Sequence, residues 1–256
     1  MNIVVSLTTV PTRLHNAGEP TAKLALKNLL EQSYSPYEVH FNVPTHYKEE
    51  EVIIPSWLDD YQNKYNHLKV FRTPDYGAIT KLLPTLERIT DPETIIIVVD
   101  DDLYYMDGII QEHINGRIKY PDCALGFAGM TALDGSCHFC TTLNKDTRVK
   151  LLEGYKTVSY KRSFFDNLED LKTNFVDKTW NDDVSLSAYM GYKNIHKIVL
   201  SYSKDTDFSP RVESFPVIGH IPAERGGCSF FRHCEESQAK SEKNIQEFFR
   251  LGYLER

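Results

Sequence analysis

Apolar residues in the first half of the chain are spaced in two ways, one typical of strands and the other of helices. The run Ile95-Ile96-Ile97-Val98-Val99 is apolar and β-branched throughout, as in a strand buried on both faces of a sheet. Between residues 21 and 32, apolar side chains recur three and four positions apart and so share one helix face: Ala22, Ala25, Leu26, Leu29 and Leu30. The chain therefore combines both kinds of element.

The two patterns alternate along the first half of the chain. They predict strands at residues 2–7, 37–43, 68–72, 94–99 and 124–128, and helices at residues 21–32, 57–65, 81–89 and 106–119. Strands interleaved with helices form a parallel sheet that the helices cover on both faces. We therefore expect an α/β fold with a mostly parallel central sheet.

The second half of the chain, from about residue 137, has a looser pattern. It predicts part of a hairpin at residues 155–160, helices at 163–172 and 183–190, and a strand at 195–200. Residues 201–234 are rich in Pro, Gly and Ser and are expected to be irregular. We expect one domain over residues 1–234, with a charged C-terminal helix within residues 235–256 packed on it.

The composition is that of an ordinary globular protein and excludes several classes of function. The 256 residues are 41% hydrophobic and 25% charged, enough for a sizeable core. The net charge of −7 argues against nucleic acid or an anionic membrane as a general partner. No segment reaches transmembrane length, and the N-terminus is too short for a signal peptide. Five cysteines, an odd number, and no Asn-x-Ser/Thr sequon favour a reducing compartment. We therefore expect a cytoplasmic protein, either free or peripheral at a membrane surface.

Three consecutive acids, Asp100-Asp101-Asp102, follow the apolar run directly. The carboxyl end of a strand is where ligands bind in open α/β sheets. If the segment stays extended, Asp100 and Asp102 point the same way, and their repulsion favours a divalent cation between them. Mg²⁺ or Mn²⁺ held by one or two carboxylates completes its shell with water and substrate phosphate. The alternative is a polar loop in which Asp is a turn former.

Two other segments are expected at the same carboxyl edge of the sheet, where they would supply cations and let the backbone approach a ligand closely. The loop after the first strand ends in Arg13 and offers hydroxyls and backbone N–H groups to a nucleotide. In the segment Asp75–Lys81, Gly77 permits close approach to a ligand, and Lys81 is expected in the first turn of a helix. A cation there opposes the helix dipole unless it binds a diphosphate that also meets the helix N-terminus. The alternative is a solvated surface lysine.

A second acid pair lies in the segment Trp180-Asn181-Asp182-Asp183, at the start of a predicted helix. The two acids could serve as a helix N-cap with a favourable dipole contact. They could instead supply a general base that deprotonates an acceptor hydroxyl. We expect Asp183 to be the base and Asp182 to act as cap or acceptor ligand.

The order of these motifs resembles that of GT-A glycosyltransferases, in particular the family-2-like inverting group. The resemblance spans roughly residues 1–200 and depends on Thr8-Thr9-Val10-Pro11-Thr12-Arg13, Asp75-x-Gly77-x-x-Thr80-Lys81, Asp100-Asp101-Asp102 and Asn181-Asp182-Asp183-x-x-Leu186-Ser187. Residues 152–165 also resemble the acceptor-side stretch of some bacterial and giant-virus members.

The resemblance implies a single Rossmann-like GT-A domain with a small irregular C-terminal acceptor part. Residues 1–130 would then bind a nucleoside diphosphate sugar, with UDP favoured, and residues 131–234 would bind the acceptor. The reaction implied is metal-dependent, inverting transfer of the sugar to a hydroxyl of a glycan or glycolipid, with Mn²⁺ or Mg²⁺ as cofactor.

The resemblance also assigns roles to single residues. Asp183 matches the family's base, and Asp182 stands where the family has Glu. Asp102 would bind the metal and Asp100 the ribose, with Asp100 and His220 as further metal ligands. The remaining residues implied are Thr8, Thr9, Arg13, Asp75, Lys81 and Asp101 for the nucleotide sugar, and Glu153, Tyr155 and Trp180 for the acceptor.

Two other functions compete with this hypothesis. A sugar nucleotidyltransferase or metal-dependent phosphohydrolase could use the same acids, but a pyrophosphorylase is expected to carry a Gly-rich basic loop near its N-terminus. Residues 7–19 contain one Gly and one Arg. A non-catalytic nucleotide- or sugar-binding module would keep its function in the Asp183→Asn variant, whereas a transferase would lose kcat.

Overall fold

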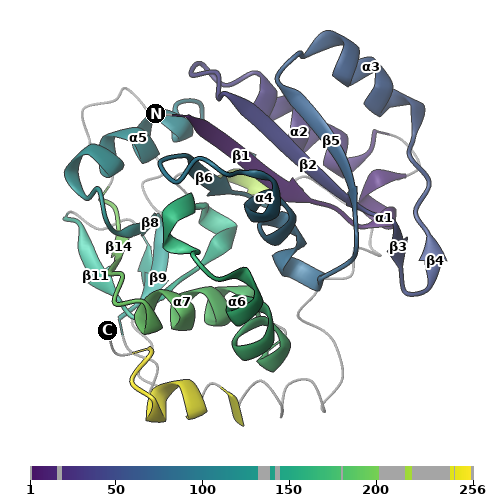
Figure 1. Cartoon of the computed structure of the whole chain (residues 1–256). Coiled ribbons are helices and arrows are strands. Elements are labelled where there is room, and N and C mark those ends of the chain that lie inside the picture. The colour runs from purple at the N-terminus through teal and green to yellow at the C-terminus, as the bar shows by residue number, and fades with distance from the viewer. Residues whose placement is uncertain are drawn as a thin grey trace.

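The computed structural model describes residues 2–15, 19–131, 139–141, 145–179, 181–201, 217–220, 243–244 and 246–254, and the side chains of 139–141 and 217–220 are not among the described parts. Its centre is an eight-stranded sheet in the order β11-β14-β8-β13-β6-β1-β2-β5 (Figure 1). The strands are β1 (Ile3–Thr8), β2 (Glu38–Pro44), β5 (Leu68–Thr73), β6 (Ile95–Val98), β8 (Ala124–Gly126), β11 (Thr147–Val149), β13 (Val158–Lys161) and β14 (Lys197–Val199).

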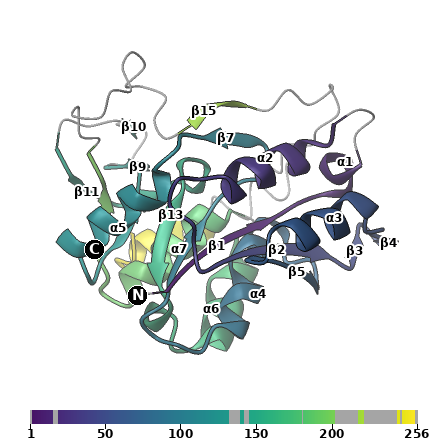
Figure 2. The same cartoon turned by 90° about the horizontal axis from the view of Figure 1, so that it is seen from above.

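Helices and small sheets surround this central sheet (Figure 2). The helices are α1 (Pro11–Leu14), α2 (Thr21–Leu30), α3 (Ser56–Lys64), α4 (Leu83–Arg88), α5 (Ile109–Lys119), α6 (Leu168–Asn174) and α7 (Asp182–Tyr192), with short 3₁₀ helices η1 (Gly77–Lys81), η2 (Gly154–Lys156), η3 (Arg162–Phe164) and η4 (Val176–Lys178). The small sheets pair β3 (His46–Tyr47) with β4 (Glu50–Glu51), β7 (Leu103–Tyr105) with β15 (Val217–His220), and β9 (Ala128–Met130) with β10 (Phe139–Thr141) and β12 (Leu151–Leu152).

The predicted α/β architecture is confirmed, and the first hundred residues supply four neighbouring parallel strands of the central sheet, while β8 and β14 form a further parallel pair. β1 pairs in parallel with β2 and β6, and β2 pairs in parallel with β5. The four residues of β6 are each at most 1% exposed, as expected of an apolar run buried on both faces. Their carboxyl ends meet at one edge of the sheet, the edge that parallel α/β folds use for ligands.

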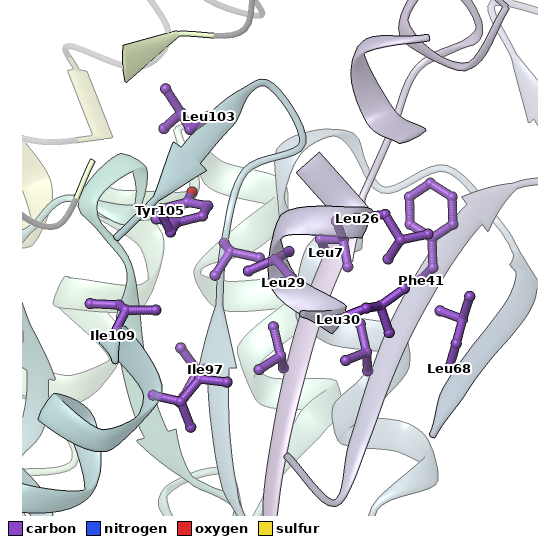
Figure 3. Close-up of a cluster of buried hydrophobic side chains, with 14 of the residues drawn as sticks. Leu7, Leu26, Leu29, Leu30, Phe41, Leu68, Ile97, Leu103, Tyr105 and Ile109 are labelled. Atoms are coloured by element: carbon purple, nitrogen blue, oxygen red, sulfur yellow. The ribbon is translucent and has the colours of Figure 1, made fainter. Parts of the chain in front are cut away.

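The side chains of the strands alternate between two hydrophobic cores, one on each face of the sheet. Leu7, Phe41 and Ile97 point into one core, where they pack against α2 and α5 (Figure 3). Ile96 and Val98 point into the other, which α4, α6 and α7 cover. The period of two along the strands therefore divides the molecule into its layers.

The strand β13 departs from the predicted pattern. Residues 155–160 were expected in a hairpin, whereas Val158–Lys161 lies between β6 and β8 and is antiparallel to both. Val158, Ser159 and Tyr160 are all buried. A four-residue strand with one serine gives too short a pattern to predict a central position, because its burial comes from partners distant in sequence.

A buried polar network attaches η1 and α4 to the sheet. Ser6 Oγ donates to the carbonyl oxygen of Lys81 at 2.5 Å, and Asn42 Nδ2 donates to Ser6 Oγ and to Thr85 Oγ1 at 3.1 Å. Lys81 is the last residue of η1, so the expectation that it opens a helix is wrong: α4 begins at Leu83. The network thus places Lys81 directly over the sheet edge.

The described part of the C-terminal segment packs on α7. Phe248 and Leu254 are 4% and 0% exposed and belong to the second core. Gly191 permits this packing, since a Cβ there would lie 1.6 Å from the Tyr253 carbonyl oxygen. Most of residues 201–242, predicted in part as irregular, lies outside the described residues. Among the helices that the structure describes, none is both long and apolar enough to cross a bilayer.

Candidate functional site

The three acids after β6 divide between two cations. The regular strand ends at Val98, and Asp101 and Asp102 lie in a turn, so simple alternation no longer sets their directions. Arg13, which lies on the short helix α1 and not in the loop expected after β1, forms ion pairs with Asp101 and with Asp102, the latter at 2.8 Å. Asp100 instead accepts a hydrogen bond from Lys81 Nζ at 2.9 Å. The strand edge thus holds three carboxylates and two cations.

Burial makes the charged forms of Asp101 and Arg13 costly. Asp101 is 3% exposed, and burial raises the pKa of its carboxyl although Arg13 opposes the shift. Burial would lower the pKa of Arg13, but Asp101 and Asp102 raise it above its usual value. The Oδ2 atom of Asp101 is buried without a hydrogen-bond partner. A buried charge of this kind is stable only beside its counter-ion.

Lys81 joins this edge to the second acid pair. Its Nζ lies 2.9 Å from Asp100 Oδ1 and 3.0 Å from Asp182 Oδ2, and its side chain is 8% exposed. Burial would lower the pKa of Lys81, but Asp100, Asp182 and Asp183 raise it well above its usual value. The ammonium therefore remains charged and brings together acids that are far apart in the sequence.

The start of α7 supplies Asp182 and Asp183. Asn181 caps this helix, because its Oδ1 accepts the N–H of Val184 at 3.1 Å. The expected capping role therefore falls to Asn181, and Asp182 pairs with Lys81. Asp183 Oδ1 accepts the backbone N–H of Gly154 at 2.8 Å. Burial and the neighbouring Asp182 raise the pKa of Asp183 well above its usual value, while Lys81 opposes the shift.

Gly154 permits the contact between η2 and this acid pair. A Cβ at Gly154 would lie 3.0 Å from both Asp183 Oδ1 and Lys81 Nζ, which is closer than side chains normally approach. The adjacent Tyr155 is also close, since burial, Glu153 and Asp183 together raise the pKa of its phenol to about 12. The sequence analysis did not single out Gly154, although a glycine beside predicted site residues often marks a close backbone approach.

A second group that the sequence analysis missed contacts the residue that follows η2. His113 on α5 is fully buried, and its ring contacts Thr157 Oγ1 at 2.7 Å and Ser159 Oγ at 3.0 Å. Thr157 follows η2 with φ of 65°, a conformation rare for a β-branched residue. Burial lowers the pKa of His113 to about 3, so the ring is neutral at pH 7. We attribute the tolerance of this backbone strain to the His113 contacts.

The structure places the other predicted site residues as follows. Asp75 is exposed and accepts the N–H of Gly77, whose φ is +71°. Thr8 Oγ1 donates to the Asn42 carbonyl at 2.8 Å. Thr9 is 3% exposed, and a hydrogen bond from its side chain to Asp101 opposes the rise in the pKa of that acid. Trp180 and the side chain of His220 lie outside the described residues. The backbone of His220 pairs with Leu103, the residue after Asp102.

The acids at the sheet edge are suited to a hard divalent cation. Asp100 and Asp102 have side chains 28% and 27% exposed, so their oxygens are accessible from solvent. Among the residues that the structure describes, no group of three His, Cys, Asp or Glu is arranged to hold a metal. The two accessible carboxylates fit a cation that takes one or two carboxylates and completes its shell with water and phosphate.

Comparisons with known proteins agree with this geometry at the level of the fold. No family model matches the chain, and no curated protein matches its sequence. Among solved structures, GalNAc-T7 with UDP, GalNAc and Mn²⁺ superposes with a TM-score of 0.57 at 14% identity, over 82% of this chain and 45% of that one. Staphylococcus aureus TarS 1–349 with UDP-GlcNAc superposes with a TM-score of 0.56 at 15% identity, over 98% of this chain and 65% of that one. The chain has the GT-A fold.

The GT-A fold is shared with enzymes of another class. The cytidylyltransferase IspD of Francisella tularensis superposes with a TM-score of 0.50 at 13% identity, over 80% of this chain and 92% of that one. The chain also spans only about half the length of several glycosyltransferase structures that it matches. The reaction must therefore be argued from the site.

Proposed function

We propose that this chain is a metal-dependent inverting glycosyltransferase that moves a sugar from a nucleoside diphosphate sugar to a hydroxyl of a glycan or glycolipid. The observation that carries the proposal is the position of Lys81 between Asp100, at the strand edge, and Asp182, beside Asp183. Glycosyl transfer needs a diphosphate site and a base next to each other, and this contact brings the two together.

The donor is proposed to lie along the carboxyl ends of β1 and β6. Arg13 and Lys81 supply positive charge for the two phosphates, and Asp102 with Asp100 would hold Mn²⁺ or Mg²⁺. When bound, the metal would neutralise the charge that develops on the leaving diphosphate. The backbone position of His220 next to Asp102 favours it as a further ligand. UDP is favoured because GalNAc-T7 and TarS were solved with UDP or a UDP-sugar.

Asp183 is proposed as the general base. Its raised pKa makes the carboxylate a stronger proton acceptor than an ordinary aspartate, and Gly154 fixes one oxygen through its N–H. The other oxygen is proposed to accept the proton of the acceptor hydroxyl. Glu153, Tyr155 and Trp180 are proposed to line the acceptor side, of which the first two adjoin Gly154 in the chain.

A nucleotidyltransferase is the second candidate, because IspD shares the fold over most of its length. The two reactions differ in products. A sugar nucleotidyltransferase releases pyrophosphate from a nucleoside triphosphate, whereas a glycosyltransferase releases a nucleoside diphosphate. Measuring both products with purified protein distinguishes the two candidates directly.

The test of the donor site is calorimetric titration of UDP, GDP and their sugars with Mn²⁺ and then with EDTA. We expect one nucleotide to bind only with metal, and the Asp102→Ala variant to lose this binding. Asp122→Ala removes an acid whose side chain is 84% exposed and serves as the matched control. Absence of binding under every metal condition would contradict the donor site.

A further inference from the structure

Glu153 is held on both sides by backbone contacts. Its N–H donates to the Ala128 carbonyl of β9 at 3.0 Å. The next N–H, of Gly154, donates to Asp183 Oδ1 at 2.8 Å. The Glu153 backbone is thus fixed between a strand and the residue that contacts the proposed base.

The carboxyl of Glu153 is buried, and Lys156 is the cation that acts on it. The residue is 9% exposed, and Oε2 is buried with no hydrogen bond. The ion pairs found among the described residues do not include Glu153. Lys156 is the charged group that lowers the pKa of Glu153, and Glu153 in turn raises the pKa of Tyr155. An ionised carboxylate in such a place is costly, whereas a carboxylic acid is tolerated and has an O–H to donate.

Electrostatics agree with this geometry. Burial raises the pKa of Glu153 to about 7, and Lys156 opposes the shift only in part. Glu153 and Asp183 both raise the pKa of the Tyr155 phenol, so the three groups share one neighbourhood.

We propose that Glu153 is held as a neutral carboxylic acid and donates a hydrogen bond to a hydroxyl oxygen of the acceptor sugar. This inference rests on the proposed glycosyltransferase function and assigns a specificity-determining residue to it. Asp183 accepts a hydrogen bond from the attacking hydroxyl, while Glu153 donates one to another hydroxyl. One hydrogen-bond acceptor and one donor together bind a neutral sugar in a single orientation. A site built this way discriminates strongly against analogues that lack the hydroxyl.

The activity test compares Glu153→Gln with Glu153→Ala, using UDP-sugars as donors and a panel of p-nitrophenyl glycosides as acceptors. Gln keeps the size and an N–H donor at every pH. We expect it to retain acceptor KM within about threefold, and Ala to raise acceptor KM by about tenfold or more, with calorimetric donor affinity unchanged in both. The ratio of Glu153→Gln to wild-type activity is expected to increase as pH rises through about 7. A Glu153→Gln variant that binds donor but transfers no sugar would overturn the proposal.

A stability measurement tests the protonation state without any substrate. The unfolded chain releases the Glu153 proton near its ordinary pKa, and the folded chain releases it near 7. As pH rises between these two values, wild type therefore loses the stability that the neutral Glu153 contributes, and Glu153→Gln does not. We expect the Tm of the variant minus that of wild type to increase by several degrees from pH 5 to pH 8. A constant difference would overturn the neutral acid.

Failure of the broader function has a different signature. If wild type binds no nucleotide with any metal, the glycosyltransferase proposal falls, and with it the sugar hydroxyl as the partner of Glu153. If wild type binds donor and transfers sugar but Glu153→Gln behaves like Glu153→Ala, only the role of Glu153 is wrong.

Discussion

Single residues connect the parts of the site, and the ammonium of Lys81 does so most directly. It contacts Asp100 and Asp182 within 3.0 Å and is nearly enclosed. Three carboxylates, Asp183 included, raise its pKa, so it is fully charged at pH 7. Without it, these acids would repel one another with no cation between them.

Lys81→Met is therefore expected to destabilise the fold. Removing one partner of a buried ion pair leaves uncompensated charge and typically costs about 3 kcal/mol or more. Urea unfolding at pH 7 measures the change. The double variant Lys81→Met with Asp182→Asn should recover part of the loss. Lys64→Met, at a side chain 63% exposed, is the matched control and should leave stability nearly unchanged. Equal effects of the two lysine variants would contradict the interpretation.

Asp183→Asn tests the base directly. We expect kcat to fall by about 10²- to 10⁴-fold because the amide cannot accept the proton, while metal-dependent donor binding persists. Steady-state kinetics with calorimetry on the same preparation measures both. Asp177→Asn, at an exposed acid on η4, is the control. An unchanged kcat for Asp183→Asn would assign the role of the base to a different residue.

At the scale of elements, α7 organises the acceptor side of the site. Its first turn carries the acid pair, and further along Ser187 Oγ accepts the N–H of Leu152, at the end of β12, at 3.0 Å. The buried Lys197 of β14 donates to the Ser187 carbonyl at 2.9 Å. These contacts hold the helix against the segment that leads to Glu153 and Gly154. The position of the base relative to η2 therefore depends on side chains remote from the chemistry.

Asp146 performs a comparable linking role at the end of the sheet. It accepts hydrogen bonds from Tyr120, after α5, and from Ser201, after β14, and pairs with Lys119. These partners lower the pKa of its carboxyl to about 2 although burial opposes the shift. Its contribution to stability is thus present above the unfolded pKa near 3.8 and is lost as pH falls toward 2.

Asp146→Asn should accordingly reduce the free energy of unfolding by about 1 kcal/mol at pH 7, allowing for screening by solvent. The difference from wild type should shrink between pH 4 and pH 2. Urea unfolding at several pH values provides the comparison, with Asp122→Asn as the exposed control. A difference that stays constant down to pH 2 would argue against the carboxylate as its source.

Elements differ in how far the sequence could predict them. The parallel strands β1, β2, β5 and β6 were predicted because their apolar residues are consecutive or alternate, and because helices with their own period lie between them in the chain. β13 was not, because four residues carry little periodicity and its place between β6 and β8 depends on long-range pairing. The start of α4 was misplaced because Lys81 belongs to η1, which the buried Ser6 hydrogen bond attaches to the sheet.

At the scale of the whole molecule, donor binding should stabilise the entire fold. A ligand that binds only the native state at 100 times its Kd adds about 2.7 kcal/mol, which corresponds to about 5–10 °C in Tm for a chain of this size. Thermal unfolding with a UDP-sugar and Mn²⁺ measures the shift. EDTA and Asp102→Ala should each abolish it. A shift that survives EDTA would show that the metal is not needed for binding.

The sequence by itself determined the α/β class, the parallel character of the sheet formed by the first strands and the two acid-rich segments, because these depend on local periodicity and residue type. The tertiary structure decided which charges meet: Arg13 with Asp101 and Asp102, and Lys81 with Asp100 and Asp182. It also decided the close approach of Gly154 to Asp183. Such contacts join segments distant in the chain, and their geometry follows from strand pairing and core packing that no short stretch of sequence contains.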